Sequence, residues 1–208
     1  CGYGILKNNE NYIAEIYLNF ENAAAYSSYQ RRHQKIAKIL SRKTGSDIVH
    51  IWTLENWKYN FTDISSRRGG LRFRFTSDVN PEVREACLKF GEWLRKEYIF
   101  PIRVPVYVKG KKYIKSMDGE MVHGTFFQPY DKRYEPYVRV ATWNYAEDLI
   151  RLGRDDALAR ILETIAHELT HYFQWINDIG LTKIGYERQA SSYADYILDE
   201  YANVVDHP

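Results

Sequence analysis

Cysteine is scarce in this sequence, with only Cys1 and Cys87 among 208 residues. Two cysteines cannot build a network of disulfides or a zinc site made of several thiolates. Long apolar runs are also missing, since no segment approaches the roughly 18 consecutive apolar residues that a membrane-spanning helix needs. The net charge is only +2, so there is no overall case for binding nucleic acid or a membrane surface.

The composition that remains is that of a globular protein. Hydrophobic residues make up 45% of the chain and charged residues 27%, which excludes the pattern of a disordered chain. Residues 1–80 hold twelve basic and seven acidic residues, an asymmetry that we interpret as a solvated face. We expect a cytoplasmic location, with a lipid-anchored lipoprotein as the alternative if Cys1 begins the mature chain.

The first 79 residues predict an N-terminal α/β extension of unknown role. Residues 11–20 are typical of a strand, and residues 21–45 of a basic helix that Gly45 would end. Residues 47–53 predict a second strand, and a short alternating strand follows the Gly-Gly pair in residues 65–75.

From residue 80 the pattern predicts an α+β domain over residues 80–208. Asn80 and Pro81 are typical of a helix start, because Asn caps well and Pro has no N–H to leave unpaired. Alternating strands are predicted in residues 100–110 and 136–143, and a hairpin in residues 113–127 turning at Asp118-Gly119. Two long helices close the chain, over about 155–178 and 184–204.

The segment "AHELTHYFQ", residues 166–174, carries the strongest chemical signal. On a helix His167 and His171 lie one turn apart, on the side opposite the apolar stripe that includes Leu169. With six His and fifteen Glu in the chain, about 0.01 HExxH segments are expected by chance. Two imidazoles at this spacing therefore indicate one zinc ion per chain. Glu168 is placed to act as the general base toward an attacking water.

A third ligand is needed, because catalytic zinc usually has three protein ligands. The extended HExxHxxGxxH pattern is excluded, since Gln174 and Asn177 occupy the Gly and His positions. Glu187 is the best candidate, because the small residues that follow it on its own helix face would allow close approach to the helix of the histidines. The other candidates are acidic or imidazole side chains further along the chain: Asp178, Asp195, Asp199, Glu200 and His207.

HELTH at 167–171 followed by Glu-x-x-Ala at 187–190 resembles the gluzincin metallopeptidases. The order of the predicted elements over about residues 80–205 is similar to that of the minimal single-domain members, the minigluzincins: backing helix, strands, active-site helix and glutamate helix. The resemblance implies a zincin-like domain, with a small mixed sheet above the zinc helix. It also implies an edge strand, in residues 124–127 or 136–143, that pairs with an extended peptide substrate.

The resemblance carries two further expectations about the site. In thermolysin-like members an acid four residues after the third ligand braces a zinc histidine, but this chain has Ser191 there. Those members also use a Tyr or His to hold the oxyanion. Tyr186, Tyr193 and His207 are the candidates here, and no motif selects one of them.

The leading functional hypothesis is a zinc-dependent peptidase. One alternative is a DNA-associated metallopeptidase whose basic segment, "QRRHQKIAKILSRK", binds nucleic acid, although no recognisable DNA-binding motif supports it. A second alternative is a non-catalytic zinc-binding module, against which Glu168 argues, because closed structural sites rarely need a base between their ligands. The sequence identifies neither the substrate nor the oligomeric state.

Overall fold

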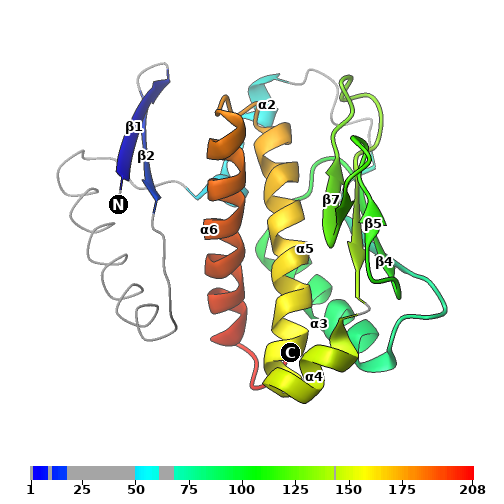
Figure 1. The fold of residues 1–208 in the computed structure, drawn as a ribbon. Helices are drawn as coiled ribbons and strands as arrows, with labels where there is room; N and C mark the ends of the chain where they lie inside the picture. The colour runs from blue at the N-terminus through cyan, green and yellow to red at the C-terminus, as the bar shows by residue number, and fades with distance from the viewer. Residues whose placement is uncertain (1, 9–10, 18–49, 61–67, 143) are drawn as a thin grey trace. The chain divides into compact units, whose positions relative to one another are not determined.

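The computed structural model describes residues 2–8, 11–17, 50–60, 68–142 and 144–208 (Figure 1). The chain divides into two compact units, Cys1–His50 and Ile51–Pro208. In the first unit, β1 (Gly2–Asn8) and β2 (Asn11–Tyr17) pair as an antiparallel hairpin. β2 confirms the strand predicted within residues 11–20, and β1 is an additional strand. The basic helix predicted over residues 21–45 lies outside the described residues.

The second unit contains a mixed four-stranded sheet in the order β3-β4-β8-β7. Three strands run parallel, and β7 pairs antiparallel with β8 at one edge. Their bounds are β3 (Leu71–Phe75), β4 (Val104–Lys109), β7 (Gly124–Phe127) and β8 (Tyr137–Ala141). A short hairpin of β5 (Ile114–Lys115) and β6 (Met121–Val122) precedes β7. Its turn contains Gly119 with a φ of 95°, which confirms the turn predicted at Asp118-Gly119.

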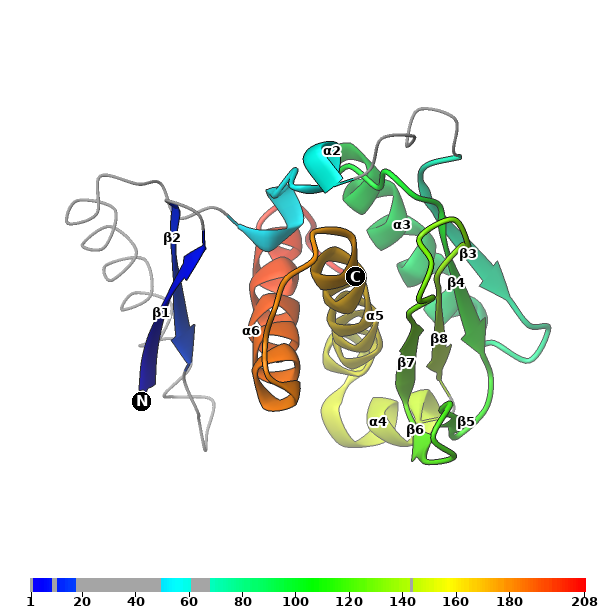
Figure 2. The ribbon, with the colours of Figure 1, turned by 90° about the horizontal axis from the view of Figure 1, so that it is seen from above.

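Helices α3 (Pro81–Glu97) and α5 (Arg154–Ile176) pack against this sheet. Helices α4 (Tyr145–Leu152) and α6 (Lys183–Ala202) pack on α5. Figures 1 and 2 both show α5 between α6 and the sheet. The predicted start of α3 is confirmed, since the Asn80 side chain accepts a hydrogen bond from the Glu82 N–H at 2.8 Å.

The core lies between the sheet and helices α3 and α5. Alternate residues of β4 and β8 point into it and are fully buried: Val104, Val106, Val108, Val138 and Val140. The apolar stripe of α5 meets them, with Leu162, Ile165 and Leu169 buried to 1% exposure or less. This packing holds α5 against the sheet, and therefore fixes where His167 and His171 lie relative to the sheet.

One predicted strand is wrong in its described part. Residues 47–53 were expected to be extended, but Ile51–Thr53 form the 3₁₀ helix η1, followed by the short helix α2 (Trp57–Asn60); residues 47–49 lie outside the described residues. Ile51 and Trp52 are both 2% exposed, whereas a strand sends successive side chains to opposite faces. A tight turn buries both, and it lets the Trp52 indole N–H donate to Thr170 Oγ1 at 3.0 Å.

The compact unit begins earlier than the boundary expected at residue 80. Ile51 and Trp52 belong to its core, and β3 is one of its sheet strands. Residues 51–79 are therefore part of the unit that carries α5 and α6.

The helix α4 has no counterpart among the predicted elements. Its Ile150 is 89% exposed, while Tyr145 and the charged Asp148 are buried, so its inward face is not purely apolar. Asp148 is held by ion pairs to Arg151 at 2.7 Å and Arg160 at 3.3 Å.

The described part of the chain has the α+β class that the sequence predicts. No helix within it is both long and apolar enough to cross a membrane.

Candidate metal centre

Two neighbouring helices bring the candidate ligands together. α5 carries His167 and His171 one turn apart, on the side away from its buried apolar stripe. α6 carries Glu187 in its first turns, after Thr182 caps the helix by accepting a hydrogen bond from the Gly185 N–H at 3.1 Å. The two helices pack side by side (Figures 1 and 2).

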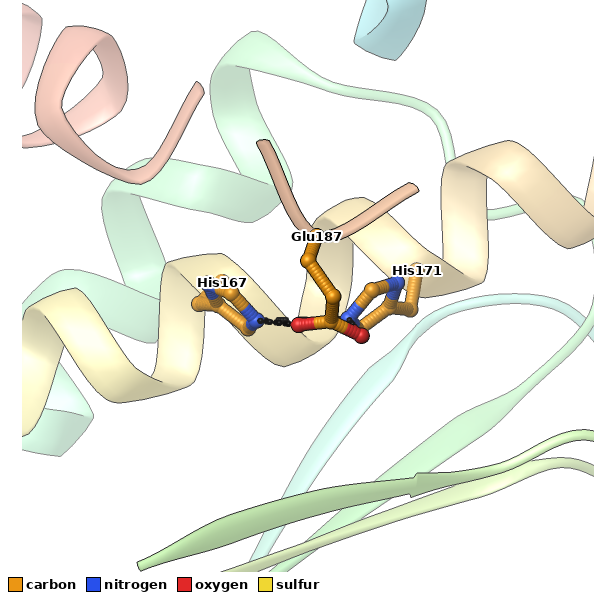
Figure 3. A group of neighbouring side chains, drawn as sticks. All are labelled: His167, His171 and Glu187. Carbon is orange, nitrogen blue, oxygen red and sulfur yellow. Dashed lines mark hydrogen bonds and ion pairs between the residues drawn. The ribbon is translucent and has the colours of Figure 1, made fainter. Parts of the chain in front are cut away.

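The donor atoms of these three residues converge on one point (Figure 3). The Nε2 atoms of His167 and His171 are 3.2 Å apart. The Glu187 carboxylate places Oε2 3.3 Å from His167 Nε2, and Oε1 3.6 Å from His171 Nε2. One donor atom from each residue lies within 4.8 Å of the others, and this is the one such group among the described residues.

The close approach of α6 follows from two small side chains. Ala190 and Ala194 are 0% and 1% exposed, as expected for residues on the helix face that contacts α5. Ser191 was expected on the same face, but the structure leaves it exposed. Two alanines one turn apart therefore bring the backbones close enough for Glu187 to reach the histidines.

The other candidate ligands are engaged elsewhere. Asp178 pairs with Lys132, and His207 pairs with Asp155 at 2.8 Å. Glu200 accepts hydrogen bonds from the hydroxyls of Tyr98 and Tyr196. Neither Asp195 nor Asp199 belongs to the metal-binding group found among the described residues.

The three groups influence one another's protonation. The hydrogen bond with His171 holds the pKa of Glu187 below its ordinary value. Burial, together with the charge of His171, lowers the pKa of His167. Burial also opposes the charged form of His171, but its hydrogen bond to Glu187 and the charge of Glu168 outweigh this effect and raise its pKa. A neutral imidazole and an ionised carboxylate are the forms that bind zinc.

Glu168 lies between α5 and the edge strand β7. It is 7% exposed, and burial raises the pKa of its carboxyl group to about 7, an effect that the Phe126 backbone partly offsets. A Cβ atom on Gly124 would lie 2.5 Å from Glu168 Oε1. The bare backbone of Gly124 therefore allows the strand to approach α5 and leaves room for this carboxylate.

A cleft of about 720 Å³ opens at these residues. Its walls come from α5, from the start of α6, from β7 and from the β5–β6 hairpin. His167, Glu168, His171 and Glu187 line it on one side, and Asp118 and Glu120 of the hairpin on another. The site is therefore reachable from solvent, although Glu168 itself is buried.

The oxyanion candidates differ in position. Tyr186 lines the cleft, but its hydroxyl donates to the carbonyl of Ile179. The Tyr193 hydroxyl accepts from the Ile51 N–H at 3.2 Å, and His207 lies against Asp155. Tyr186 is the only one of the three candidates that lines the cleft.

Sequence reasoning missed the partner of His171. Its Nδ1 lies 2.7 Å from Gln174 Oε1. In the sequence, Gln174 was noted only as a departure from the HExxHxxGxxH pattern. The spacing of three residues along the helix was the available signal, because such residues are neighbours on a helix surface.

Comparison of the chain with protein-family models, with curated proteins and with solved structures finds no significant match. The resemblance to gluzincins therefore depends on the motif residues and on the site geometry described above.

Proposed function

We propose that this protein is a zinc-dependent peptidase of the gluzincin type. The observation that carries the proposal is the convergence of His167 Nε2, His171 Nε2 and the Glu187 carboxylate, with Glu168 beside them in the same cleft. The order of α3, the sheet, α5 and α6 agrees with the zincin-like arrangement that the sequence resemblance implies.

The donor set and its spacing fit zinc. Two neutral imidazoles and one carboxylate are typical ligands of catalytic zinc. For bonds of about 2.05 Å at tetrahedral angles, ligand atoms lie about 3.3 Å apart. The closest separations here are 3.2, 3.3 and 3.6 Å. Three protein ligands leave the fourth position for water, whose pKa a bound zinc lowers to about 7.

Glu168 is assigned as the general base. Its carboxyl group lies in the same cleft as the two histidines and the Glu187 carboxylate, within the site where a base toward the attacking water is needed. Glu168 takes the proton of the water that attacks the peptide carbonyl carbon, and passes it to the departing nitrogen. Its position under β7 keeps the carboxylate out of bulk solvent.

The free edge of β7 is the proposed binding edge for an extended peptide. His123 O accepts from the Ala141 N–H at 2.8 Å, so His123 and Ala141 form a hydrogen-bonded pair. Antiparallel pairs alternate between bonded and non-bonded. Gly124 and Phe126 consequently turn their backbone groups away from β8, toward the cleft. An added peptide strand would pair with these groups, apart from the Phe126 N–H, which faces the Glu168 carboxylate.

Two variants test this proposal. His167→Ala should lose zinc as measured by elemental analysis, because one of three ligands is removed. Glu168→Gln should keep the zinc and lose cleavage of a peptide library, because only the base is removed. A Glu168→Gln protein that cleaves as fast as the parent would contradict the peptidase mechanism. Zinc without cleavage in the parent would instead favour the non-catalytic zinc-binding module.

A further inference from the structure

The hydrogen bonds around Gln174 fix the orientation of its amide. This side chain is 2% exposed and lies between α5 and α6. Its Nε2 lies 3.0 Å from the backbone carbonyl oxygen of Tyr186. A carbonyl oxygen only accepts hydrogen bonds, so the Gln174 atom facing it must be the NH₂ group. The amide oxygen of Gln174, Oε1, therefore faces His171.

That orientation determines which ring nitrogen of His171 carries the hydrogen. Gln174 Oε1 can only accept, so His171 Nδ1, 2.7 Å away, must donate. In the neutral ring the other nitrogen, Nε2, then carries the lone pair. Nε2 is the atom that points toward His167 and Glu187. One amide group thus presents the atom of His171 that a metal ion needs.

The same amide also connects His171 to the helix of the third ligand. Gln174 Nε2 donates a second hydrogen bond, to Gln189 Oε1 at 2.9 Å. Tyr186 directly precedes Glu187, and Gln189 follows it by two residues. Gln174 therefore links His171 to the backbone and a side chain on both sides of Glu187.

We propose that Gln174 is a positioning residue for the metal centre, which holds His171 in the tautomer with Nε2 free and fixes α6 at the distance that Glu187 requires. A neutral amide does this without adding a buried negative charge next to the exposed carboxylate of Glu187. The inference rests on the metal site of the proposed function.

The test compares Gln174→Met with Gln128→Met in the full-length protein. The substitution is the same, but Gln128 is an exposed residue of the cleft wall. Loss of a hydrogen-bond partner of a metal ligand commonly weakens metal binding by about 10–100-fold. Chelator competition should show a weakening of this size in Gln174→Met, and a zinc Kd for Gln128→Met within about twofold of the parent. A folded Gln174→Met protein with the zinc affinity of the parent would overturn the proposal.

A second measurement needs no metal, and its decisive arm is the parent protein itself. Nitrogen NMR of the His171 ring in the metal-free parent, at alkaline pH, should show the hydrogen on Nδ1. Gln174→Glu should retain that tautomer, because a carboxylate also accepts, and Gln174→Met should lose it. A parent ring with its hydrogen on Nε2 would refute the inference even if the Met variant does not fold. A parent that binds no zinc would refute the proposed function and leave the tautomer result to be judged alone.

Discussion

Replacing Gly124 with alanine tests whether the spacing between β7 and α5 positions Glu168. The new Cβ would lie 2.5 Å from Glu168 Oε1, 2.7 Å from Thr164 Cγ2 and 2.9 Å from Glu168 Cγ. Unstrained contacts between such atoms begin at about 3.5 Å, so the strand or the glutamate must move by up to about 1 Å. The glutamate has little free space, since Glu168 is 7% exposed.

The expected cost of this crowding is about 1–3 kcal/mol. For a unit of this size each kcal/mol lowers the Tm by about 2–4 °C, so Gly124→Ala should melt about 2–12 °C below the parent. A displacement of about 1 Å at a catalytic group can lower the rate by about 100-fold. Zinc affinity should not change, because the three atoms nearest to the new Cβ belong to Glu168 and Thr164 and not to a ligand.

Gly180→Ala is the matched control. A Cβ at Gly180 would meet nothing within 4 Å, and this residue lies in the loop between α5 and α6. Its Tm should equal or slightly exceed that of the parent, because alanine restricts the unfolded chain. Thermal melting, chelator competition and peptide cleavage would be measured for both variants. A Gly124→Ala protein that matches the parent in both Tm and cleavage would refute the reasoning.

Three further outcomes are expected. Glu187→Ala should weaken zinc binding by at least about 10–100-fold, whereas Asp195→Ala should bind zinc like the parent. If chelator titration instead shows weakened binding in Asp195→Ala and parental affinity in Glu187→Ala, Glu187 is excluded as a ligand. Burial and the charges of Glu163 and Asp199 raise the pKa of Asp195 from 3.8 to about 6. The ionised Asp195 therefore destabilises the folded protein above about pH 6, and this cost disappears below the pKa of 3.8 that we take for the unfolded chain. Asp195→Asn should therefore be more stable than the parent at pH 8, by about 1 kcal/mol after allowance for its partial exposure, and the gain should vanish by about pH 4; urea melts with a gain that is independent of pH would contradict this. A fragment of residues 51–208 should fold and bind zinc, whereas residues 78–208 should aggregate because they lack β3 and the buried Trp52. Gel filtration and zinc analysis would compare the two fragments. A soluble, zinc-binding 78–208 fragment would show that residues 51–77 are dispensable.

The elements that the sequence predicts well are those whose own pattern matches their packing. In α5 the apolar stripe that includes Leu162, Ile165 and Leu169 is the buried face, so the opposite face had to carry His167 and His171. In β4 the alternate residues Val104, Val106 and Val108 are likewise the buried ones. The choice of Glu187 over later acids depended on small neighbouring residues, of which Ala190 and Ala194 are buried.

The elements that the sequence does not predict depend on contacts between distant residues. Ile51 and Trp52 are apolar neighbours that fit a strand, but Trp52 is directed by its hydrogen bond to Thr170, 118 residues away. In α4 one of the two buried residues is Asp148, which is stabilised by two arginines rather than by apolar packing. Gln174 was similarly hidden, because its role depends on the Tyr186 carbonyl of another helix.

The strand β7 has a consequence for redesign of this protein. Its inner side limits the space of Glu168 at Gly124, and its free edge borders the cleft. Any library of variants that shifts this strand to admit bulkier ligands will also disturb the buried carboxylate. The β5–β6 hairpin carries no such linkage: its Asp118 and Glu120 line the cleft from exposed positions. Efforts to alter selectivity should therefore diversify the hairpin and leave β7 unchanged.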